Sequence, residues 1–417
     1  MDSIVFSRTK PGDWLARSVL APHVDAFQVR LRLGRYSVHI ERSYTAAIAH
    51  LARWMMQCCL PLTHLDERSV EQFVGQHLPH CDCPSPVSRD RRSTSAACGH
   101  LLVVLRERGA IARPAIPTGP IEEELRRYDA HLRDARGLTE GTRRGQLHSV
   151  RRLLLYKFAD GPVQIAQLQP EELREFINQQ LELRATASHA AALTSALRMY
   201  LRYRATCGDQ VHALIGVIAS PVQWRLATLP RALTRAQINQ LLRSFTCALP
   251  TPRRGYAIVR CALDLGLRSG EVARLKLDDI DWRAGTVTLR RTKSHRQDIL
   301  PLPSRTGQAL AAYIRYERPK STDRAVFVRR LAPHGQPIGV DAIRRVIRDA
   351  YRRIGLPHGR THALRHTLAC QLLERGASLK EVADVLRHRS LNTSLIYAKL
   401  DHRRLSAVAL PWPGSGP

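Results

Sequence analysis

The segment of residues 361–401 constrains the fold of this chain most, because it carries several chemically distinctive side chains at short, fixed spacings. His362 and Arg365 are three residues apart, so they share a face if the segment is helical. Apolar residues at helical spacing further on predict a second, short amphipathic helix. His388 follows this helix, and Tyr397 comes nine residues later. These four groups together suit nucleophilic attack on a phosphodiester, so we expect the two helices to gather them into one site.

The order H-x-x-R, then H, then Y about nine residues on resembles the C-terminal signature of the tyrosine recombinases, the phage-integrase family of DNA strand-exchange enzymes. The resemblance implies that Tyr397 is the nucleophile and that Arg365 grips the phosphate. It also implies that His362 accepts or relays the phenol proton and that His388 hydrogen-bonds a non-bridging oxygen. We expect His366, in the same H-x-L-R-H string, to be structural and hydrogen-bonded inside its domain.

A second motif lies at Ala262–Trp282, A-L-D-L-G-L-R-S-G-E-V-A-R-L-K-L-D-D-I-D-W, and matches the family pattern G-x-R-x-x-E around its first catalytic arginine. This match makes Arg268 the candidate, with Glu271 following in register. We expect Ser269 to cap the helix that begins there. Guanidinium groups suit a phosphate because they donate parallel hydrogen bonds and keep their charge.

A third motif, residues 285–302, predicts a β-hairpin, because apolar and polar residues alternate on either side of a polar turn. Lys293 lies in or beside the turn, among several arginines. The resemblance implies that a hairpin lysine protonates the departing 5′ oxygen. Lysine can give up a proton and arginine cannot, which favours Lys293 as the general acid. An ordinary basic turn that contacts phosphate is the alternative.

The charge of the chain points to a polyanionic partner. Lys and Arg number 65 against 36 Asp and Glu, a net charge of +29. No apolar run approaches the ~20 residues of a membrane span, and no signal peptide is evident. The nine cysteines are odd in number and irregularly spaced, which favours a reducing compartment. We expect a cytoplasmic, nucleoid-associated bacterial protein that binds double-stranded DNA.

A length of 417 residues predicts two or three domains. The expected fold class is mainly α with a small β-hairpin or sheet: a helical core-binding domain plus a mixed α+β catalytic domain of the tyrosine-recombinase type. Proline-rich stretches indicate the boundaries. The predicted parts are an N-terminal helical region at 1–115, which serves as an extra DNA- or partner-binding module, a helical core-binding (SAM-like) domain at 119–215, the catalytic domain at 230–405 and a tail at 406–417.

An internal similarity relates the two helical regions. L-D-E-R-S-V-E-Q-F-V from Leu65 aligns with L-Q-P-E-E-L-R-E-F-I from Leu168, and the same offset of 103 residues places Tyr44 on Leu147 and Leu51 on Leu154. Two interpretations fit this pattern. One is a duplicated helical DNA-binding module, and the other is chance matching of two amphipathic helix pairs.

One group of residues in the N-terminal region has the residue types of a zinc site: His77, His80, Cys81, Cys83, Cys98 and His100. Its C-x-C spacing differs from the C-x₂-C of a structural zinc finger. We therefore predict neither a metal site nor a cofactor.

These observations predict a site-specific recombinase or integrase, and they leave its role open among integration, transposition of a mobile element, resolution and dimer separation. By resemblance, it would cleave and rejoin duplex DNA through a 3′-phosphotyrosine, without metal or ATP. A homo-tetramer would act at synapsis, with accessory recombination proteins as further partners. The alternatives are a type IB topoisomerase with the same chemistry and a non-catalytic DNA-binding protein on the same fold.

Overall fold

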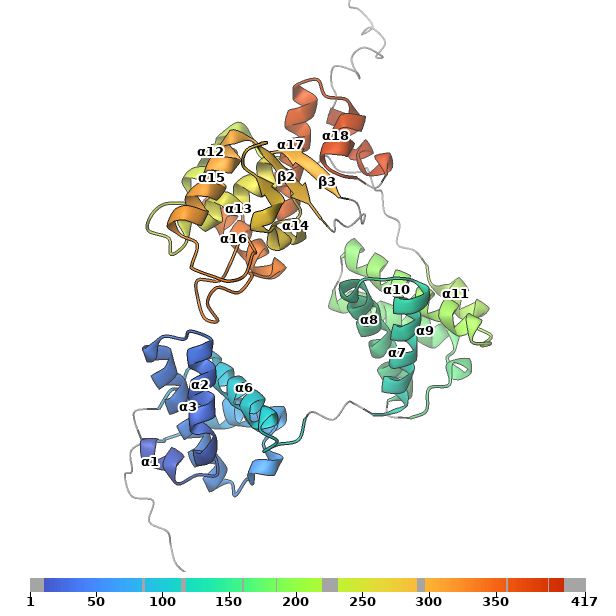
Figure 1. Ribbon diagram of the computed structural model, residues 1–417. Helices are drawn as coiled ribbons and strands as arrows, with labels where there is room; N and C mark the ends of the chain where they lie inside the picture. Colours follow the sequence, from blue (N-terminus) through green and yellow to red (C-terminus); the bar gives the residue numbers. More distant parts are fainter. Residues whose placement is uncertain are drawn as a thin grey trace, which may run out of the picture. The chain divides into compact units, whose positions relative to one another are not determined.

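Helices joined by short connections make up most of the chain, and the only strands among the described residues form one small sheet (Figure 1). The described residues within 112–224 form one compact unit, and those within 1–111 and 225–417 form the other. The computed structural model describes residues 11–84, 87–113, 118–159, 161–184, 186–219, 232–290, 297–357, 359–388 and 390–400.

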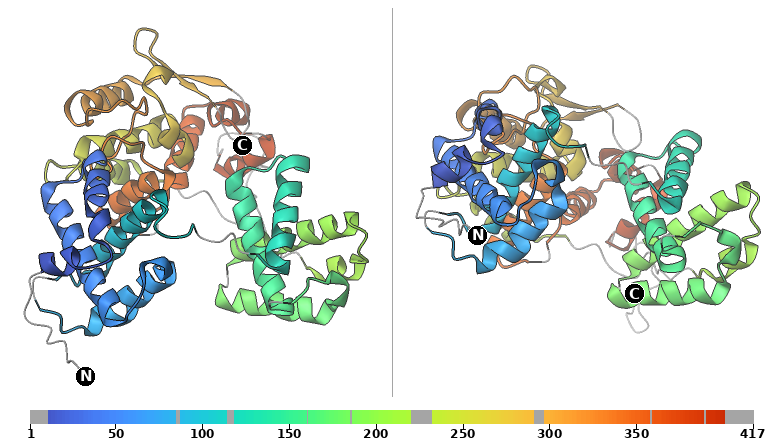
Figure 2. Two further views of the ribbon diagram at one scale, coloured as in Figure 1. Left: turned by 60° about the horizontal axis from the view of Figure 1, so that its bottom comes forward. Right: turned by 90° about the horizontal axis from the view of Figure 1, so that it is seen from below.

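The N-terminal helices enclose their own hydrophobic core, and α2, α3 and α6 lie side by side around it (Figures 1 and 2). Asp66 caps α4 by accepting a hydrogen bond from the Ser69 N–H at 2.8 Å, which confirms the N-cap predicted there. The elements are α1 (Pro11–Ala16), α2 (Val24–Leu33), α3 (Val38–Gln57), the 3₁₀ turn η2 (Leu62–His64), α4 (Glu67–Gln72), the π-helical turn η3 (Phe73–His77), α5 (Leu78–His80) and α6 (Arg91–Glu107).

Residues 118–219 form a helical bundle around a second core. The carboxylate of Glu124, buried in this bundle, accepts hydrogen bonds from the Tyr200 hydroxyl and the Arg204 guanidinium, both at 2.9 Å. Because the buried charge is paired, it is compatible with an apolar core. The elements are α7 (Pro120–Ala130), the π-helical turn η4 (His131–Ala135), α8 (Glu140–Phe158), η5 (Ile165–Gln167), α9 (Pro170–Leu183), α10 (Ala187–Thr206) and α11 (His212–Val217).

The two helical regions repeat at the predicted offset of 103 residues. The turns η2 and η5 begin 103 residues apart, and so do α4 and α9. Leu65 and Leu168, which follow the turns, are both buried and have nearly the same backbone angles, φ −76° with ψ 111° and 118°. The main difference is the connection to the last helix, which is longer before α6 than before α10.

Residues 232–400 carry the sheet and a third core, to which α13, α15 and α16 contribute. The Thr234 side chain caps α12 by accepting from the Gln237 N–H at 3.2 Å, as predicted. The first elements are α12 (Arg235–Arg243), α13 (Pro252–Asp264), α14 (Ser269–Arg274), β1 (Ile280–Asp281), β2 (Thr286–Leu289), β3 (Asp298–Pro301) and α15 (Ser304–Tyr316). They are followed by α16 (Val340–Arg353), α17 (Thr361–Glu374), α18 (Leu379–Val385), η7 (Leu391–Thr393) and η8 (Leu395–Leu400).

The strand order is β1-β2-β3 with antiparallel pairing throughout. Val287 pairs with Leu300, and Thr288 pairs with Ile299, so the predicted hairpin is confirmed. The two helices predicted around His362 and after Gly376 correspond to α17 and α18. The fold class is therefore mainly α with one small antiparallel sheet, as expected from the sequence. Within the described residues, no helix has the length and apolar character that a membrane span requires.

Candidate active site

Arg268 lies at the N-cap of α14, where its backbone and side chain share one carboxylate. Its N–H donates to Glu271 Oε2 and its Nη1 donates to Glu271 Oε1, both at 2.8 Å. The prediction that Ser269 caps this helix is wrong. Ser269 is the first helical residue, and its hydroxyl donates to Thr361 Oγ1 at 3.2 Å. This hydrogen bond ties the start of α14 to the start of α17.

Arg365 lies one turn into α17 and is 5% exposed. Its Nη1 donates to the Gly266 carbonyl at 2.5 Å, and its Nη2 donates to the Leu386 carbonyl. His362, one turn earlier on the same helix, is exposed. The helix therefore brings these two predicted site residues together, and hydrogen bonds to two backbone carbonyls fix the guanidinium group of Arg365.

A third arginine, Arg387, completes this network and is not among the residues predicted from the sequence. Its Nη2 donates to Glu271 Oε2 at 3.0 Å and to the Gly266 carbonyl at 3.1 Å, and its side chain is 3% exposed. Its backbone has a φ of 55°, a conformation that non-glycine residues seldom adopt. The one signal in the sequence is its position directly before His388.

Tyr397 lies in η8 and is 2% exposed, packed against α17 and α18 in a small apolar cluster. Its hydroxyl is 2.8 Å from Nδ1 of His366. The ring of His388 lies parallel to the Tyr397 ring, with the two ring centroids 6.4 Å apart. His388 in turn contacts Ser394 through its Nδ1, at 2.6 Å. His366 is thus hydrogen-bonded inside its module, as expected, and its partner is the predicted nucleophile. In this conformation the phenol contacts His366 rather than His362.

Burial and the arginine charges set the protonation of these groups. Burial raises the pKa of Tyr397 to about 12, and the positive charge of Arg365 opposes this shift. Burial, Arg365 and Arg268 lower the pKa of His388 to about 4. The side chain of His362 is exposed, but desolvation by the surrounding protein and the charges of Arg365 and Arg268 still lower its pKa. Burial, His362 and Arg365 lower the pKa of His366. All three imidazoles are therefore neutral near pH 7 and can accept protons.

The arginines of the network compete for one negative charge. Burial lowers the pKa of Arg365 to about 9, and repulsion by Arg268 and Arg387 adds to the shift. Burial alone would raise the pKa of Glu271, but the charges of Arg387 and Arg268 outweigh it, so that pKa is lowered. The site therefore carries an excess of positive charge, which an anion can neutralise.

Five of the six predicted site residues lie in the described part of the chain: Arg268, His362, Arg365, His388 and Tyr397. Lys293 falls within residues 291–296, outside the described residues, between the hairpin strands β2 and β3. The arrangement of the other five can bind an anion between guanidinium groups and offer it a phenol beside neutral imidazoles.

Comparison with known proteins places this geometry in a family. The sequence model of the phage integrase family matches residues 231–404. The chain is also 38% identical to "Putative integrase/recombinase y4rA" of Sinorhizobium fredii over 384 residues, which cover 91% of each protein. The chain belongs to the phage integrase family of tyrosine recombinases. Members of this family catalyse DNA strand exchange.

Other tyrosine recombinases cover the chain less fully. Tyrosine recombinase XerC of Pseudomonas putida is 31% identical over 291 residues, 69% of this chain and 95% of XerC. The structure of XerH recombinase bound to its palindromic difH substrate covers 83% of this chain and 97% of that one, with a TM-score of 0.55 at 18% identity. A lambda integrase (75-356) dimer bound to a core site covers 70% and 99%, with a TM-score of 0.53 at 15% identity. These structural similarities confirm that the chain has the fold of the tyrosine recombinases.

Proposed function

We propose that this tyrosine recombinase is a site-specific recombinase or integrase that cleaves and rejoins duplex DNA through a covalent 3′-phosphotyrosine at Tyr397. The observation that carries the proposal is the convergence of Arg268, Arg365, His388 and Tyr397, which come from segments up to 129 residues apart, on one region with excess positive charge.

In the proposed reaction, a backbone phosphate binds between Arg268 and Arg365. Their guanidinium groups stabilise the negative charge that develops on the non-bridging oxygens, with His388 as a further hydrogen-bond partner. The Tyr397 oxygen bonds to phosphorus while the bond from phosphorus to the 5′ oxygen breaks. The phenol proton passes to a neutral imidazole, for which His366 at 2.8 Å and His362 are the candidates. The departing 5′ oxygen receives a proton from Lys293.

The proposed cleavage conserves the energy of the broken DNA bond, because one phosphodiester is exchanged for another. The free 5′ hydroxyl of the same or another strand reverses the step, so rejoining requires no ATP. Arginine and histidine side chains supply the positive charge that stabilises the transition state.

The buried position of Tyr397 is a resting arrangement in this proposal. Its pKa of about 12 disfavours ionisation while the ring is packed in its apolar cluster. DNA binding must therefore bring the phosphate and the Tyr397 hydroxyl together. Either η8 moves toward the bound phosphate, or the DNA backbone moves toward Tyr397. The proposed oligomer is a homo-tetramer on two DNA sites. A lambda integrase tetramer bound to a Holliday junction shares the fold, with a TM-score of 0.51 at 17% identity.

A suicide substrate tests the proposal. Duplexes of the genomic sequence that flanks the encoding gene carry a nick close to the cleavage point, so that the released fragment diffuses away and the adduct accumulates. We expect a covalent protein–DNA adduct with the wild type and none with Tyr397→Phe, which should bind the same DNA with unchanged affinity. Equal amounts of adduct from both proteins would contradict the assignment of Tyr397. Binding without any adduct would favour a non-catalytic protein, and relaxation of supercoils without recombinant products would favour a topoisomerase.

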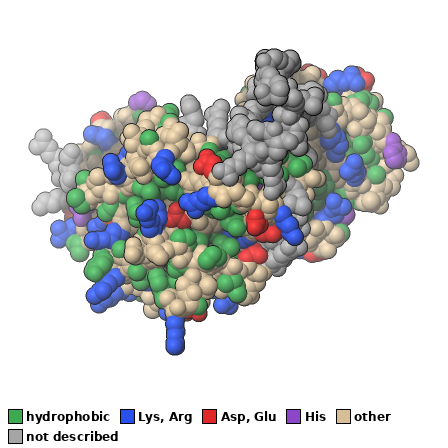
Figure 3. All heavy atoms as spheres, turned by 90° about the horizontal axis from the view of Figure 1, so that it is seen from above, with side chains coloured by type: hydrophobic (Ala, Val, Ile, Leu, Met, Phe, Trp, Pro, Cys, Tyr) green, Lys and Arg blue, Asp and Glu red, His purple; other side chains and the backbone are tan. Residues whose placement is uncertain are grey.

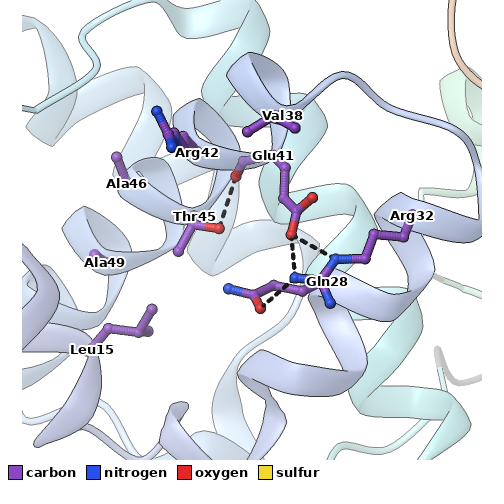
Figure 4. Close-up of a pocket in the computed structure, with 9 residues that line it drawn as sticks. All are labelled: Leu15, Gln28, Arg32, Val38, Glu41, Arg42, Thr45, Ala46 and Ala49. Carbon is purple, nitrogen blue, oxygen red and sulfur yellow. Dashed lines mark hydrogen bonds and ion pairs between the residues drawn. The ribbon is translucent and has the colours of Figure 1, made fainter.

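We further propose that residues 11–111 are a second copy of the helical DNA-binding module at 118–219. The repeated turns and helices support this assignment, and so do two grooves at corresponding places. The groove between α2 and α3 has a volume of about 500 Å³ and is lined by Arg32, Glu41 and Arg42, among others (Figure 4). The groove between α7 and α8 has a volume of about 380 Å³ and is lined by Arg143 and Arg144, among others. Basic side chains in both grooves suit contacts with phosphate.

A further inference from the structure

Four side chains of the N-terminal module converge on one point. His50 lies on α3, and His77 ends the π-helical turn η3. Cys81 and Cys83 follow in the loop after α5. The four nitrogen and sulfur atoms that can bind a metal all lie within 4.8 Å of one another. Nε2 of His50 is 3.2 Å from Nε2 of His77, which is 3.8 Å from Sγ of Cys83.

These separations fit a tetrahedral metal centre. Zinc binds histidine nitrogen at ~2.0–2.1 Å and cysteine sulfur at ~2.3 Å, which places the ligand atoms of a tetrahedron about 3.3–3.8 Å apart. The distances of 3.2 and 3.8 Å fall at or next to this range, and no pair of the four atoms is more than 4.8 Å apart. Two thiols and two imidazoles are also a ligand set typical of structural zinc sites.

The charges in and around the cluster suit a divalent metal. Two thiolates would balance the charge of a divalent ion. Two cations lie beside them: Arg53, which interacts with Cys83, and Arg89, whose Nη2 donates to the Cys81 carbonyl at 3.1 Å.

A hydrogen bond between two imidazoles is the simpler interpretation of the 3.2 Å contact, but it explains only half of the cluster. It gives no reason for two thiols to point at the same place. All nine cysteines lie in described residues and are free, so no disulfide accounts for Cys81 and Cys83. The His50 ring also interacts with the Ser88 backbone, and a backbone partner of this kind is common for the second nitrogen of a metal-bound histidine.

The internal repeat locates the cluster where the two modules differ. The positions 103 residues after His50 and His77 are Leu153 and Gln180, neither of them a metal ligand in this setting. The connection from the cysteines to α6 is also longer than its counterpart before α10. The cluster thus accompanies the longer loop, which a metal would fasten to α3.

We propose that His50, His77, Cys81 and Cys83 bind a structural zinc ion that holds the loop after α5 against α3. Four protein ligands fill the tetrahedron, as in structural rather than catalytic zinc sites. The residue types in the sequence point to His77, Cys81 and Cys83, but their C-x-C spacing does not predict the site. His50 was missed because it lies on a separate helix, whereas His80 is exposed and His100 contacts the Tyr36 hydroxyl at 3.0 Å.

Metal analysis of the full-length chain, purified without chelator, tests the proposal. We expect about one zinc per chain in the wild type and less than about a tenth of that in Cys81→Ser/Cys83→Ser. The control Cys58→Ser/Cys59→Ser removes two exposed thiols of the same module, and His80→Ala removes the adjacent exposed histidine. Both controls should keep the zinc. An equivalent amount of another metal, or zinc retained in the cluster variant, would overturn the assignment.

A second measurement avoids dependence on the folding of the variant. Cobalt added to chelator-treated wild-type protein should give the thiolate charge-transfer and d–d absorption bands of a tetrahedral sulfur-ligated site, and zinc should abolish them. Absence of these bands, together with metal-free wild-type protein, would refute the site. The proposal does not rest on the catalytic function, because Tyr397→Phe should bind zinc as the wild type does.

Discussion

At the scale of single residues, Glu271 determines how the arginines are arranged. Its buried carboxylate accepts from Arg268 at 2.8 Å and from Arg387 at 3.0 Å, and Arg365 lies in the same region. Without this negative charge, three cations would face one another with little solvent to screen them. The carboxylate therefore holds the anion-binding arginines in place, although it does not contact the proposed substrate itself.

Glu271→Gln should destabilise the protein by about 3–5 kcal/mol, the usual cost of removing one partner of a buried ion pair. Urea unfolding followed by circular dichroism measures the change. Glu140→Gln is the matched control. It breaks an ion pair with Arg144 in which both side chains are more than 70% exposed, so we expect almost no loss of stability. A small effect of Glu271→Gln would show that the arginines need no counter-charge.

The same variant has a defined pH dependence. Because the folded pKa of Glu271 is lowered from 4.5, the carboxylate stabilises the fold above that pH, and the contribution is lost as the pH falls through the lowered value. The stability difference between wild type and Glu271→Gln should therefore shrink as the pH is lowered from 6 towards 3. A difference that stays constant over this range would contradict the pairing.

His366→Phe should slow adduct formation by about 10²–10⁴-fold, the usual contribution of a general base. The pKa of His366 is lowered from 6.5, so the wild-type rate should rise with pH below that value and then level off. Without this acceptor, the phenol, with a pKa of about 12, should give a rate that keeps rising into the alkaline range. His366→Asn keeps a hydrogen-bonding side chain that cannot act as a base. Compared with His366→Phe, it should restore the position of Tyr397 but not the rate of adduct formation. An unchanged pH profile would assign the proton to His362.

At the scale of elements, the turn before α14 positions the whole network. The Gly266 carbonyl accepts from both Arg365 and Arg387, and the residue has a φ of +58°. A side chain there would meet Leu386 Cδ2 at 2.9 Å and Leu368 Cδ2 at 3.0 Å. The close approach of three segments therefore requires glycine at this position.

Gly266→Ala should cost about 3 kcal/mol or more, because backbone strain adds to overpacking, and it should also reduce adduct formation. Thermal unfolding and the suicide substrate measure the two effects. Gly285→Ala is the control. Its φ is +63°, but a side chain there meets nothing within 4 Å, so only the strain of about 1–2 kcal/mol is expected. Equal losses in both variants would show that packing around Gly266 is not tight.

The elements that the sequence predicted are those with local causes. Alternation predicts the hairpin, 3.6-residue periodicity predicts α18, and single oxygen-bearing side chains predict the caps at Asp66 and Thr234. The cap expected from Ser269 fails because the helix begins at Ser269 itself, which leaves Arg268 at the N-cap. Local patterns contain no information about which distant groups meet a buried carboxylate.

At the scale of the whole molecule, contacts between distant segments account for what the sequence did not predict. Arg387 joins the site through its contact with Glu271, which lies 116 residues earlier, and the sequence marks it only by its position before His388. His50 on α3 contacts His77 in η3, although the two residues are 27 positions apart in the sequence. The repeat, by contrast, was visible in the sequence as a weak alignment, and the matching element boundaries now favour duplication over chance.

The net charge of +29 makes DNA affinity a property of the whole chain. Lys and Arg side chains appear at many separate positions in Figure 3. Each phosphate contact lowers the slope of log K against log salt by about 0.9. We therefore expect affinity for a long duplex without a specific site to fall steeply between 50 and 200 mM salt, in a gel-shift titration.

Arg42→Glu tests whether the N-terminal module contributes to this binding. Arg42 is exposed and lines the groove between α2 and α3 (Figure 4), so its reversal should reduce the salt slope by about 1 and weaken binding to all sequences alike. Arg68→Glu, at an exposed position of α4, changes the net charge equally. If the groove contacts phosphate, Arg42→Glu must lose more of the slope than Arg68→Glu. Equal losses would mean that only overall charge is sensed and that the second copy of the module does not contact DNA through this groove.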